Sequence, residues 1–501
     1  MSSLWIETTK DDLKLNELNK NEETDICVIG AGLFGLTTAY YLSKFRKKVT
    51  VIEKGKIGEK VSGNTTGKIT SQHGLFYDHL ISDYGEDFAR KYLEANEKAI
   101  ENIKKIISEE EINCDFEEKD AYVYTTKQDE IQNIEKEVEA VKKIGKEAEF
   151  VTEIKNFPFK IKGAIKFKNQ AQFHARKYMI GLCKSILAQN NKIYENTTAI
   201  EVEKSLDGYI VHTDKGEIFA KEIVLATHFP ILNFPGFYFT KMYQNTSYLI
   251  AIETNKKTPE GMFIGAEEPH YSFRTAKYNG KDILLIGGSE HKTGEAVATN
   301  EKYKELEDFA KKYYQDCNVL FKWNTRDCIS LDKIPYIGEF STFMKKVYVG
   351  TGFKKWGMTS SNVAACIVTD KILGKENEYE EIFNSKRMKP IKNRWEMKNM
   401  FQNTVNNLVF DKFRIEPFGI DQIENDNGAI IEKDNEILGV YKDISGKIYA
   451  VKPICSHLGC LLSWNNTDKT WDCPCHGSRF DYMGKNIYEP AIKGLEVVKF
   501  E

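Results

Sequence analysis

A chain of 501 residues is longer than one ordinary hydrophobic core supports, so two or three domains are expected. Its hydrophobic fraction of 41% is sufficient for packed cores. The net charge of −3 argues against a protein that binds nucleic acid broadly, because such a protein needs a basic face.

The N-terminal residues 1–12 lack the basic region and apolar run of a signal peptide, so a cytoplasmic protein is expected. The most apolar window, residues 25–42, has the length of a membrane span. Its glycine spacing instead predicts a buried strand, a tight turn and a helix. We therefore expect no membrane span.

Residues 1–22 are polar and are predicted to form an N-terminal arm. Strands at 24–30 and 48–53 flank a helix at 33–45. Apolar spacing predicts further helices over 86–108, 128–144, 177–189 and 301–315. Strands are expected at 121–126, within 198–226 and 246–290, and at the start of 346–373, where a glycine-rich turn and a helix follow. Residues 376–407 are charged and predict a linker, and short strands with turn signals from 408 onward predict a separate all-β domain.

The run "DICVIGAGLFG" places Gly30, Gly32 and Gly35 in the spacing GxGxxG between an apolar strand and a helix. The first glycine permits the tight turn, the second lets a pyrophosphate approach the backbone, and the third lets the helix pack on the strand. The helix N-terminus supplies free N–H groups to the phosphates. Glu53, at the end of the next strand, would accept a hydrogen bond from a ribose 2′-hydroxyl, which disfavours NADP.

This motif alone leaves NAD and FAD open. Residues 62–74 are rich in small hydroxyl side chains, and "VGTGFKKWGMTSS" (349–361) forms a second glycine-rich turn between a strand and a helix. FAD is long enough to touch both regions, whereas NAD would leave the second unused. The predicted cofactor-binding residues are Gly30, Gly32, Leu33, Phe34, Gly35, Glu53, Lys54, Ser62, Asn64, Thr65, Thr66, Gly350, Gly352, Trp356, Gly357 and Met358.

Over residues 22–375 the chain resembles the FAD-dependent amine and amino-acid oxidoreductases, the superfamily of D-amino-acid oxidase and glycine oxidase. The resemblance rests on the glycine motif, Glu53, the 62–67 loop, "IVLATH" (223–228), "LDKIPYIG" (331–338) and the glycines of 350–357. It implies an α/β Rossmann-like FAD-binding domain interleaved with an α+β substrate domain, together spanning 23–375. The FAD-binding parts would lie at about 23–85, 160–230 and 325–375, and the substrate parts at about 86–159 and 231–324.

Three polar residues are candidates for catalysis in this domain. Lys68, in the loop expected beside the flavin, could stabilise charge on the ring or act on substrate. His73 could face the same site, and Arg274 could bind a substrate carboxylate bidentately. Each also has a structural alternative: a solvated lysine, a core histidine and an ion pair on a sheet face.

Four of the ten cysteines fall within 21 residues, whereas the other six are scattered and are expected to be buried thiols. Cys455-x-His457 and Cys473-x-x-His476 together offer two cysteines and two histidines. Tetrahedral zinc and a Rieske [2Fe–2S] cluster both use this donor set. Two further cysteines, Cys460 and Cys475, stand one in each of the matched runs "CSHLGC" and "CPCHGS".

These runs resemble the Rieske proteins of cytochrome bc complexes, and the similarity extends over about 410–501, within a predicted domain of 408–501. The resemblance implies that Cys455, His457, Cys473 and His476 are cluster ligands and that Cys460 and Cys475 form a disulfide. It also implies a small all-β Rieske domain after the linker.

A flavin takes two electrons from an organic substrate, and a [2Fe–2S] cluster carries one at a time. The leading hypothesis is therefore an FAD-dependent dehydrogenase of an amine or amino-acid-like substrate, exchanging electrons through the cluster with a donor or acceptor protein. An electron-transfer relay without small-molecule turnover and a redox sensor are the alternatives. A flavin site that lacks a pocket with convergent polar groups would favour the relay.

Overall fold

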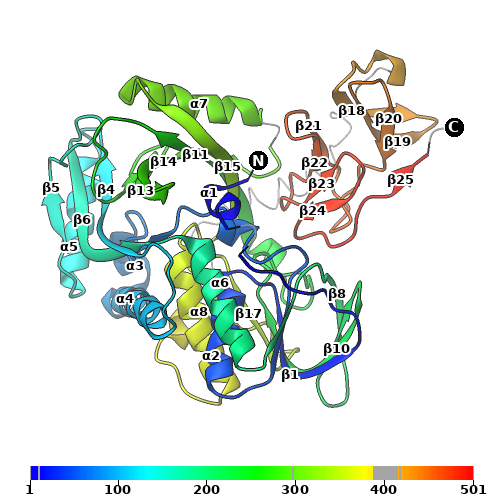
Figure 1. The fold of residues 1–501 in the computed structure, drawn as a ribbon, viewed down its shortest axis with the longest axis horizontal. Coiled ribbons are helices and arrows are strands. Elements are labelled where there is room, and N and C mark those ends of the chain that lie inside the picture. Colours follow the sequence, from blue (N-terminus) through cyan, green and yellow to red (C-terminus); the bar gives the residue numbers. More distant parts are fainter. Residues whose placement is uncertain (1, 10–11, 296–297, 388–415, 417–418, 500–501) are drawn as a thin grey trace.

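The computed structural model describes residues 2–9, 12–295, 298–387, 416 and 419–499. Figure 1 shows two large sheets with their helices and, at the C-terminal end, a smaller all-β part. The C-terminal part packs against the rest of the chain through contacts described below.

The first sheet has eight strands and is built from three separate stretches of the sequence. Its main path runs β16 (Tyr336–Glu339), β17 (Val347–Thr351), β10 (Gly216–Leu225), β1 (Glu22–Ile29), β2 (Val49–Ile52) and β7 (Lys192–Tyr194). The strands from β17 to β7 are parallel, and β16 is antiparallel to β17. At the side of β10, β9 (Tyr209–Thr213) and β8 (Ala199–Lys204) extend the sheet. Burial on both faces of the parallel strands explains why β2, β17 and the second half of β1 (26–29) are mostly apolar.

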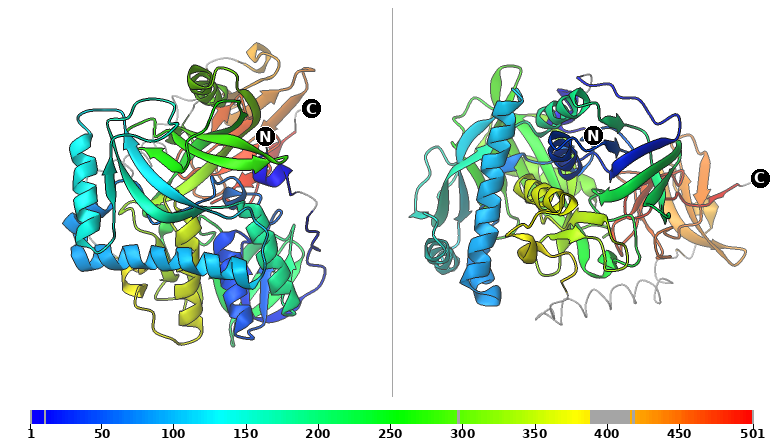
Figure 2. Two further views of the ribbon diagram at one scale, coloured as in Figure 1. Left: turned by 60° about the vertical axis from the view of Figure 1, so that its left-hand side comes forward. Right: turned by 90° about the horizontal axis from the view of Figure 1, so that it is seen from below.

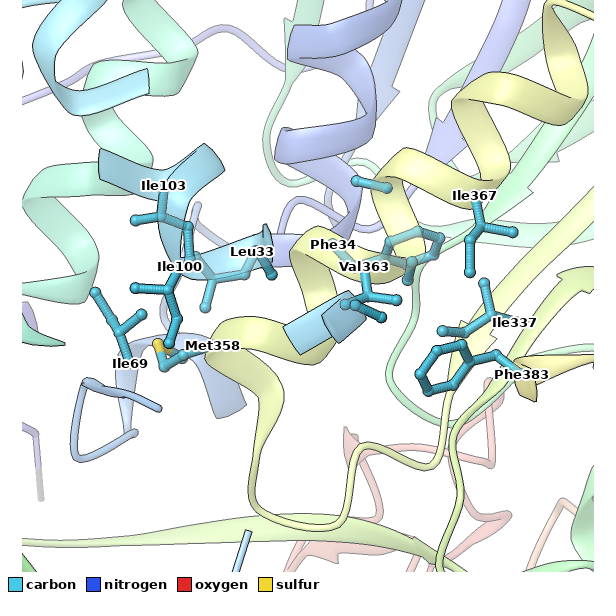
Figure 3. Close-up of a cluster of buried hydrophobic side chains, with 14 of the residues drawn as sticks. Leu33, Phe34, Ile69, Ile100, Ile103, Ile337, Met358, Val363, Ile367 and Phe383 are labelled. Atoms are coloured by element: carbon cyan, nitrogen blue, oxygen red, sulfur yellow. The ribbon is translucent and has the colours of Figure 1, made fainter. Parts of the chain in front are cut away.

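Helices α2 (Leu33–Lys44), α6 (Ala175–Ala188) and α8 (Gly357–Ile372) pack together at this sheet. Figure 3 shows the core at the N-terminal ends of α2 and α8, where Leu33, Phe34, Met358 and Val363 meet Ile100 and Ile103 of α4 (Glu86–Glu109). The long α4 runs across this helical layer (Figure 2). The core therefore fixes the positions of the two helix N-termini that follow glycine-rich turns.

The second sheet has nine strands. Its path runs β15 (Asn318–Ser330), β11 (Met242–Glu253), β14 (Lys281–Lys292), β13 (Ser272–Tyr278), β12 (Met262–Gly265), β4 (Glu117–Thr125), β6 (Gly163–Gln172) and β3 (Lys68–Ile69), with β5 (Glu149–Val151) beside β6. Three more helices accompany it: α3 (Tyr77–Tyr84), α5 (Ile131–Lys143) and α7 (Thr299–Tyr313). Most of these pairings are antiparallel, as expected for an α+β part.

The C-terminal part contains two four-stranded antiparallel sheets. One consists of β18 (Asn427–Lys433), β19 (Glu436–Lys442), β20 (Ile448–Val451) and β25 (Val497–Val498). The other consists of β21 (Ser463–Asn465), β22 (Thr470–Asp472), β23 (Arg479–Asp481) and β24 (Asn486–Tyr488). The predicted fold class, a Rossmann-like sheet interleaved with an α+β part and followed by a small all-β part, is confirmed.

Two stretches without a predicted element carry short helices. Within residues 1–22, α1 (Leu4–Glu7) buries Leu4 and Trp5. Within the predicted linker, α9 (Glu380–Phe383) packs beside β16, while residues 388–407 lie outside the described residues. In the described part of the chain, no helix combines the length and hydrophobicity needed to cross a membrane.

Candidate functional site

A cavity of about 250 Å³ lies where the two large sheets and the C-terminal part meet. One wall is the turn between β1 and α2 together with the end of β2. The 60–68 loop, β11, β14, β15 and the 350–358 turn form the others. Residues 486–492 of the C-terminal part complete the lining. The cavity thus extends from the first glycine-rich turn to the second.

The first glycine turn is shaped by close backbone contacts. Gly30 has a positive φ of 109°, and a Cβ there would lie 2.4 Å from the Ala226 carbonyl oxygen. A Cβ at Gly35 would lie 2.0 Å from the carbonyl oxygen of Gly30. The backbone N–H of Leu33, at the start of α2, faces the 62–67 loop and donates to Ser62 Oγ at 3.1 Å. These contacts set the helix N-terminus against the cavity, as phosphate binding requires.

Glu53 lies at the other end of this wall. Its carboxylate accepts hydrogen bonds from the backbone N–H groups of Ala31, at 2.9 Å, and Gly55, at 3.1 Å. Burial raises the pKa of Glu53, and the two N–H donors oppose this effect. A buried carboxylate held beside the glycine turn fits the ribose of a dinucleotide.

Most of the predicted cofactor-binding residues line the cavity. Gly35, Asn64 and Gly352 do not, although Gly35 supports the turn as described. Asn64 instead accepts a hydrogen bond from Trp323 Nε1 through its carbonyl oxygen. The residues that could hold the cofactor are Gly30, Gly32, Leu33, Phe34, Glu53, Lys54, Ser62, Thr65, Thr66, Gly350, Trp356, Gly357 and Met358.

The predicted metal ligands come together in the C-terminal part. The thiols of Cys455 and Cys473 are buried, and a hydrogen bond from Cys473 lowers the pKa of the Cys455 thiol. The rings of His457 and His476 lie 5.0 Å apart, and their Nδ1 atoms are buried without a hydrogen-bond partner among the described residues. Two thiols beside two unpartnered imidazole nitrogens fit the donor set of a Rieske cluster.

Cys460 and Cys475 lie at disulfide distance, with Cα atoms 6.7 Å apart. The Cys473 sulfur lies within 4.8 Å of both disulfide sulfurs. The disulfide therefore joins the two ligand-bearing loops next to the metal site.

Comparison with known proteins decides between the cofactor alternatives. Residues 25–371 match the family described as FAD dependent oxidoreductase, and residues 419–499 match the Rieske [2Fe-2S] domain. The chain belongs to the FAD dependent oxidoreductase family. It is 35% identical over 494 residues, 99% of this chain and 97% of the other, to the Bacillus subtilis (strain 168) protein named "Putative Rieske 2Fe-2S iron-sulfur protein YhfW". FAD rather than NAD, and a [2Fe–2S] cluster rather than zinc, are therefore the implied cofactors.

Two further relatives cover the FAD dependent oxidoreductase domain. The gamma-glutamylputrescine oxidoreductase of Escherichia coli (strain K12) is 20% identical over 398 residues, 76% of this chain and 91% of its own. The crystal structure of glycine oxidase from Geobacillus kaustophilus superimposes with a TM-score of 0.63 at 17% identity, covering 74% of this chain and all of that one. This second similarity concerns the fold. The chain is thus an FAD-dependent oxidoreductase with a C-terminal Rieske domain.

The three predicted catalytic residues occupy different places in the FAD dependent oxidoreductase domain. Lys68 lines the cavity, where its Nζ donates to the Phe263 carbonyl oxygen at 2.6 Å and contacts Ser272 Oγ. Burial, together with the positive charge of Arg274, lowers the pKa of Lys68 to about 7.

His73 and Arg274 do not line the cavity. His73 is buried against Tyr92 and Thr359 and stacks on Trp356, at 5.0 Å between ring centroids. The Arg274 guanidinium donates to four backbone carbonyls, including those of Thr66 and Gly67. The contacts favour structural roles for both, and their catalytic roles stay predictions.

Sequence reasoning missed a second buried arginine, Arg326 on β15, which does line the cavity. Its Nε and Nη1 have no hydrogen-bond partner among the described residues. Burial lowers its pKa to about 10, so it remains a cation at neutral pH. Glu290, paired with Lys355, and Asp327, whose pKa burial raises to about 6, also line the cavity. The only sequence feature noted near Arg326 was the run "LDKIPYIG" (331–338), which contributed to the family resemblance.

The Rieske domain docks onto the FAD dependent oxidoreductase domain through its ligand-bearing loops. His457 Nε2 lies 2.5 Å from Asn233 Oδ1, and Gln244 Nε2 donates to the His476 carbonyl oxygen at 2.8 Å. Gln244 also lines the cavity. A single side chain therefore bridges the cavity wall and a predicted cluster ligand.

A second contact brings the Rieske domain into the cavity itself. The Tyr488 ring lies 3.9 Å from the Arg326 guanidinium, and Glu489 pairs with Lys54 at 2.5 Å. The Rieske domain thus supplies part of the cavity wall.

The N-terminal helix α1 holds the cofactor-binding loop. Trp5 is buried, and its Nε1 donates to the Thr65 carbonyl oxygen at 2.6 Å. The Ser3 hydroxyl donates to the Gly63 carbonyl oxygen at 2.5 Å. The Arg274 guanidinium lies 5.2 Å from the Trp5 ring and holds the same loop from the other side.

Removing the Trp5 side chain is expected to weaken FAD binding about tenfold, because the 62–67 loop loses a hydrogen bond of about 1.4 kcal/mol and its packing. The Trp5→Ala and Trp5→Phe proteins would be compared by fluorescence titration of the apoprotein with FAD. Trp5→Phe keeps a ring but removes the donor, so its Kd should fall between those of wild type and Trp5→Ala. Equal Kd values for all three proteins would show that α1 does not support the cofactor site.

Proposed function

We propose that the protein is a dehydrogenase of an amine that carries a carboxylate, with an α-amino acid or N-substituted glycine as the substrate class. The observation that carries this proposal is the Arg326 guanidinium, which is buried in the cavity with two unpartnered nitrogen atoms. A carboxylate satisfies such a group bidentately, and no group of opposite charge among the described residues does so.

Lys68 is proposed to act on the substrate amine. Oxidation of an amine to an imine removes a hydride from carbon and a proton from nitrogen. Bound FAD would supply the hydride acceptor. Lys68, with a pKa of about 7, is largely neutral just above neutral pH and then has a lone pair for the proton.

The Gln244 contact supports electron exchange through the Rieske cluster. Gln244 lines the cavity and donates to the backbone of His476, so the two cofactor sites share one hydrogen-bonded side chain. The cluster would carry away, one at a time, the two electrons released per substrate. The convergent polar groups of the cavity favour this dehydrogenase over a relay without turnover.

The test is an anaerobic titration of the purified protein with a panel of amines and amino acids. We expect at least one carboxylate-bearing amine to bleach the flavin absorbance and to generate the electron paramagnetic resonance of a histidine-ligated cluster. Arg326→Met should raise the Kd of that substrate on the order of 100-fold, and Arg326→Lys less, because lysine keeps the charge but not the bidentate geometry. Reduction by dithionite alone would favour the relay.

The pH dependence of flavin reduction tests the role of Lys68. The rate should rise with pH through about 7, because protonated Lys68 cannot accept a proton and neutral Lys68 can. Stopped-flow reduction of Lys68→Met should be slower by roughly 10²- to 10⁴-fold and lose this inflection.

Lys354 provides the matched control, because it also lines the cavity and burial lowers its pKa to about 7. The inflection should persist in Lys354→Met. If it disappears there and survives in Lys68→Met, Lys354 rather than Lys68 titrates in the reaction.

A further inference from the structure

An exposed group of aromatic side chains covers the predicted cluster ligands. Phe234 and Phe237 are 59% and 45% exposed, and their ring centroids lie 5.1 Å apart. Both rings also contact that of Phe239, at 5.9 and 6.1 Å. Exposed aromatic residues that gather in this way mark interaction sites rather than ordinary surface.

The same aromatic group reaches the metal site. The Phe239 ring lies 6.1 Å from that of His457 and 5.9 Å from that of His476. A continuous series of rings therefore leads from the two histidines through Phe239 to the surface at Phe234 and Phe237. These phenylalanines belong to the FAD dependent oxidoreductase domain, so this surface exists only in the docked, two-domain protein.

The segments around this aromatic group are basic, although the chain as a whole has a net charge of −3. Residues 229–246, 340–346, 452–462 and 490–495 contain lysines but neither aspartate nor glutamate. Contacts join these segments: Tyr238 to Phe340, Asn233 to His457, and Ser456 to the Lys493 carbonyl. Two lysines of these four segments have partners: Lys452 pairs with Glu436 and Glu496, and Lys241 packs on Tyr238. The three exposed lysines are Lys345, Lys346 and Lys493.

We infer that Phe234, Phe237, Lys345, Lys346 and Lys493 form a docking surface for a small acidic one-electron carrier protein. The inference rests on the proposed function, because it names the class of partner that takes the electrons. One electron would pass from the reduced cluster to the oxidised carrier, with no transfer of atoms or protons. The lysines would steer the acidic carrier to the surface, and the aromatic rings would give a small apolar contact that dissociates readily.

The experiment uses the full-length protein with its cluster reduced by dithionite and the excess removed. An acidic blue-copper protein, whose copper accepts one electron at a potential above that of a Rieske cluster, is the probe. Cytochrome c, a basic one-electron acceptor, is the charge control. Stopped-flow absorbance follows reoxidation of the cluster, and isothermal titration calorimetry measures the Kd of the oxidised proteins. We expect the reaction with the blue-copper protein to slow as ionic strength rises, because salt screens the steering charges.

Two variants test the surface itself. One double variant carries Phe234→Ala and Phe237→Ala, and the other carries Lys345→Glu and Lys346→Glu. Each should lower the second-order rate constant about tenfold and weaken binding of the blue-copper protein. Two controls should leave both quantities unchanged. Ile444→Ala removes an exposed apolar side chain of the Rieske domain that does not belong to the aromatic group. Lys257→Glu reverses an exposed charge just after the C-terminal end of β11.

Unchanged rates and Kd values in both double variants would overturn the proposal, as would faster reoxidation by cytochrome c or by a short-chain quinone alone. The resonance of the cluster, recorded in each variant, shows that the metal site is intact. Because the cluster is reduced chemically, a failure to oxidise any amine would contradict the proposed function and leave this result standing.

Discussion

Cys473→Ser is expected to abolish the iron–sulfur cluster while leaving FAD bound. Cys473 is buried among the cluster-ligand candidates, and a serine hydroxyl does not replace a thiolate as an iron ligand. Iron and acid-labile sulfide should fall from two of each per chain to near zero. The resonance of the histidine-ligated cluster should vanish with them.

Cys183→Ser is the control for the general cost of replacing a buried thiol. Cys183 lies in α6, is buried and belongs to the FAD dependent oxidoreductase domain. The Cys183→Ser protein should keep its iron and the electron paramagnetic resonance of its cluster. A Cys473→Ser protein with full iron content would show that Cys473 is not a ligand.

Gly35→Ala is expected to destabilise the fold by about 3 kcal/mol and to yield protein without FAD. The new Cβ would lie 2.0 Å from the Gly30 carbonyl oxygen and 3.1 Å from Ala226 Cβ, both in the packed turn. The helix α2 would have to move away from β1, and its N-terminus would leave the phosphate position. Thermal unfolding and the ratio of flavin to protein absorbance measure the two effects.

Gly55→Ala is the matched control from the same region. A Cβ there meets nothing closer than 3.9 Å, and its backbone N–H still donates to Glu53. Its melting temperature and FAD content should equal those of wild type. Equal values for Gly35→Ala as well would mean that α2 adjusts to the added methyl group without loss of the site.

The parts of the site that are local in sequence could be predicted. The strand, glycine turn and helix around Gly30, and the two loops around Cys455 and Cys473, each carry their chemistry within a few residues. Short-range spacing therefore revealed the two cofactor sites, and the family resemblances implied FAD and a [2Fe–2S] cluster. The same is true of the long amphipathic helix α4, whose apolar period is visible over 86–108.

What depends on strand pairing or domain docking could not be predicted. Arg274 and Arg326 both lie in strands, and their sequence neighbours do not show that the two side chains have different surroundings. Only the arrangement of β13 and β15 in the second sheet directs Arg274 to backbone carbonyls and leaves Arg326 unpartnered in the cavity. Trp5 lies in a polar stretch, and its burial comes from a loop 60 residues away. Nothing near residue 488 indicates that Tyr488 completes a cavity in another domain.

The docked position of the Rieske domain has a consequence for how the protein is assembled. Cys455, Cys473 and His476, three of the predicted cluster ligands, are buried, and the loops that carry them face the FAD dependent oxidoreductase domain. An iron–sulfur donor could reach these ligands only before the two domains close on each other. We therefore expect metal insertion to precede closure of the two domains, and closure to shield the finished cluster from chelators and oxidants.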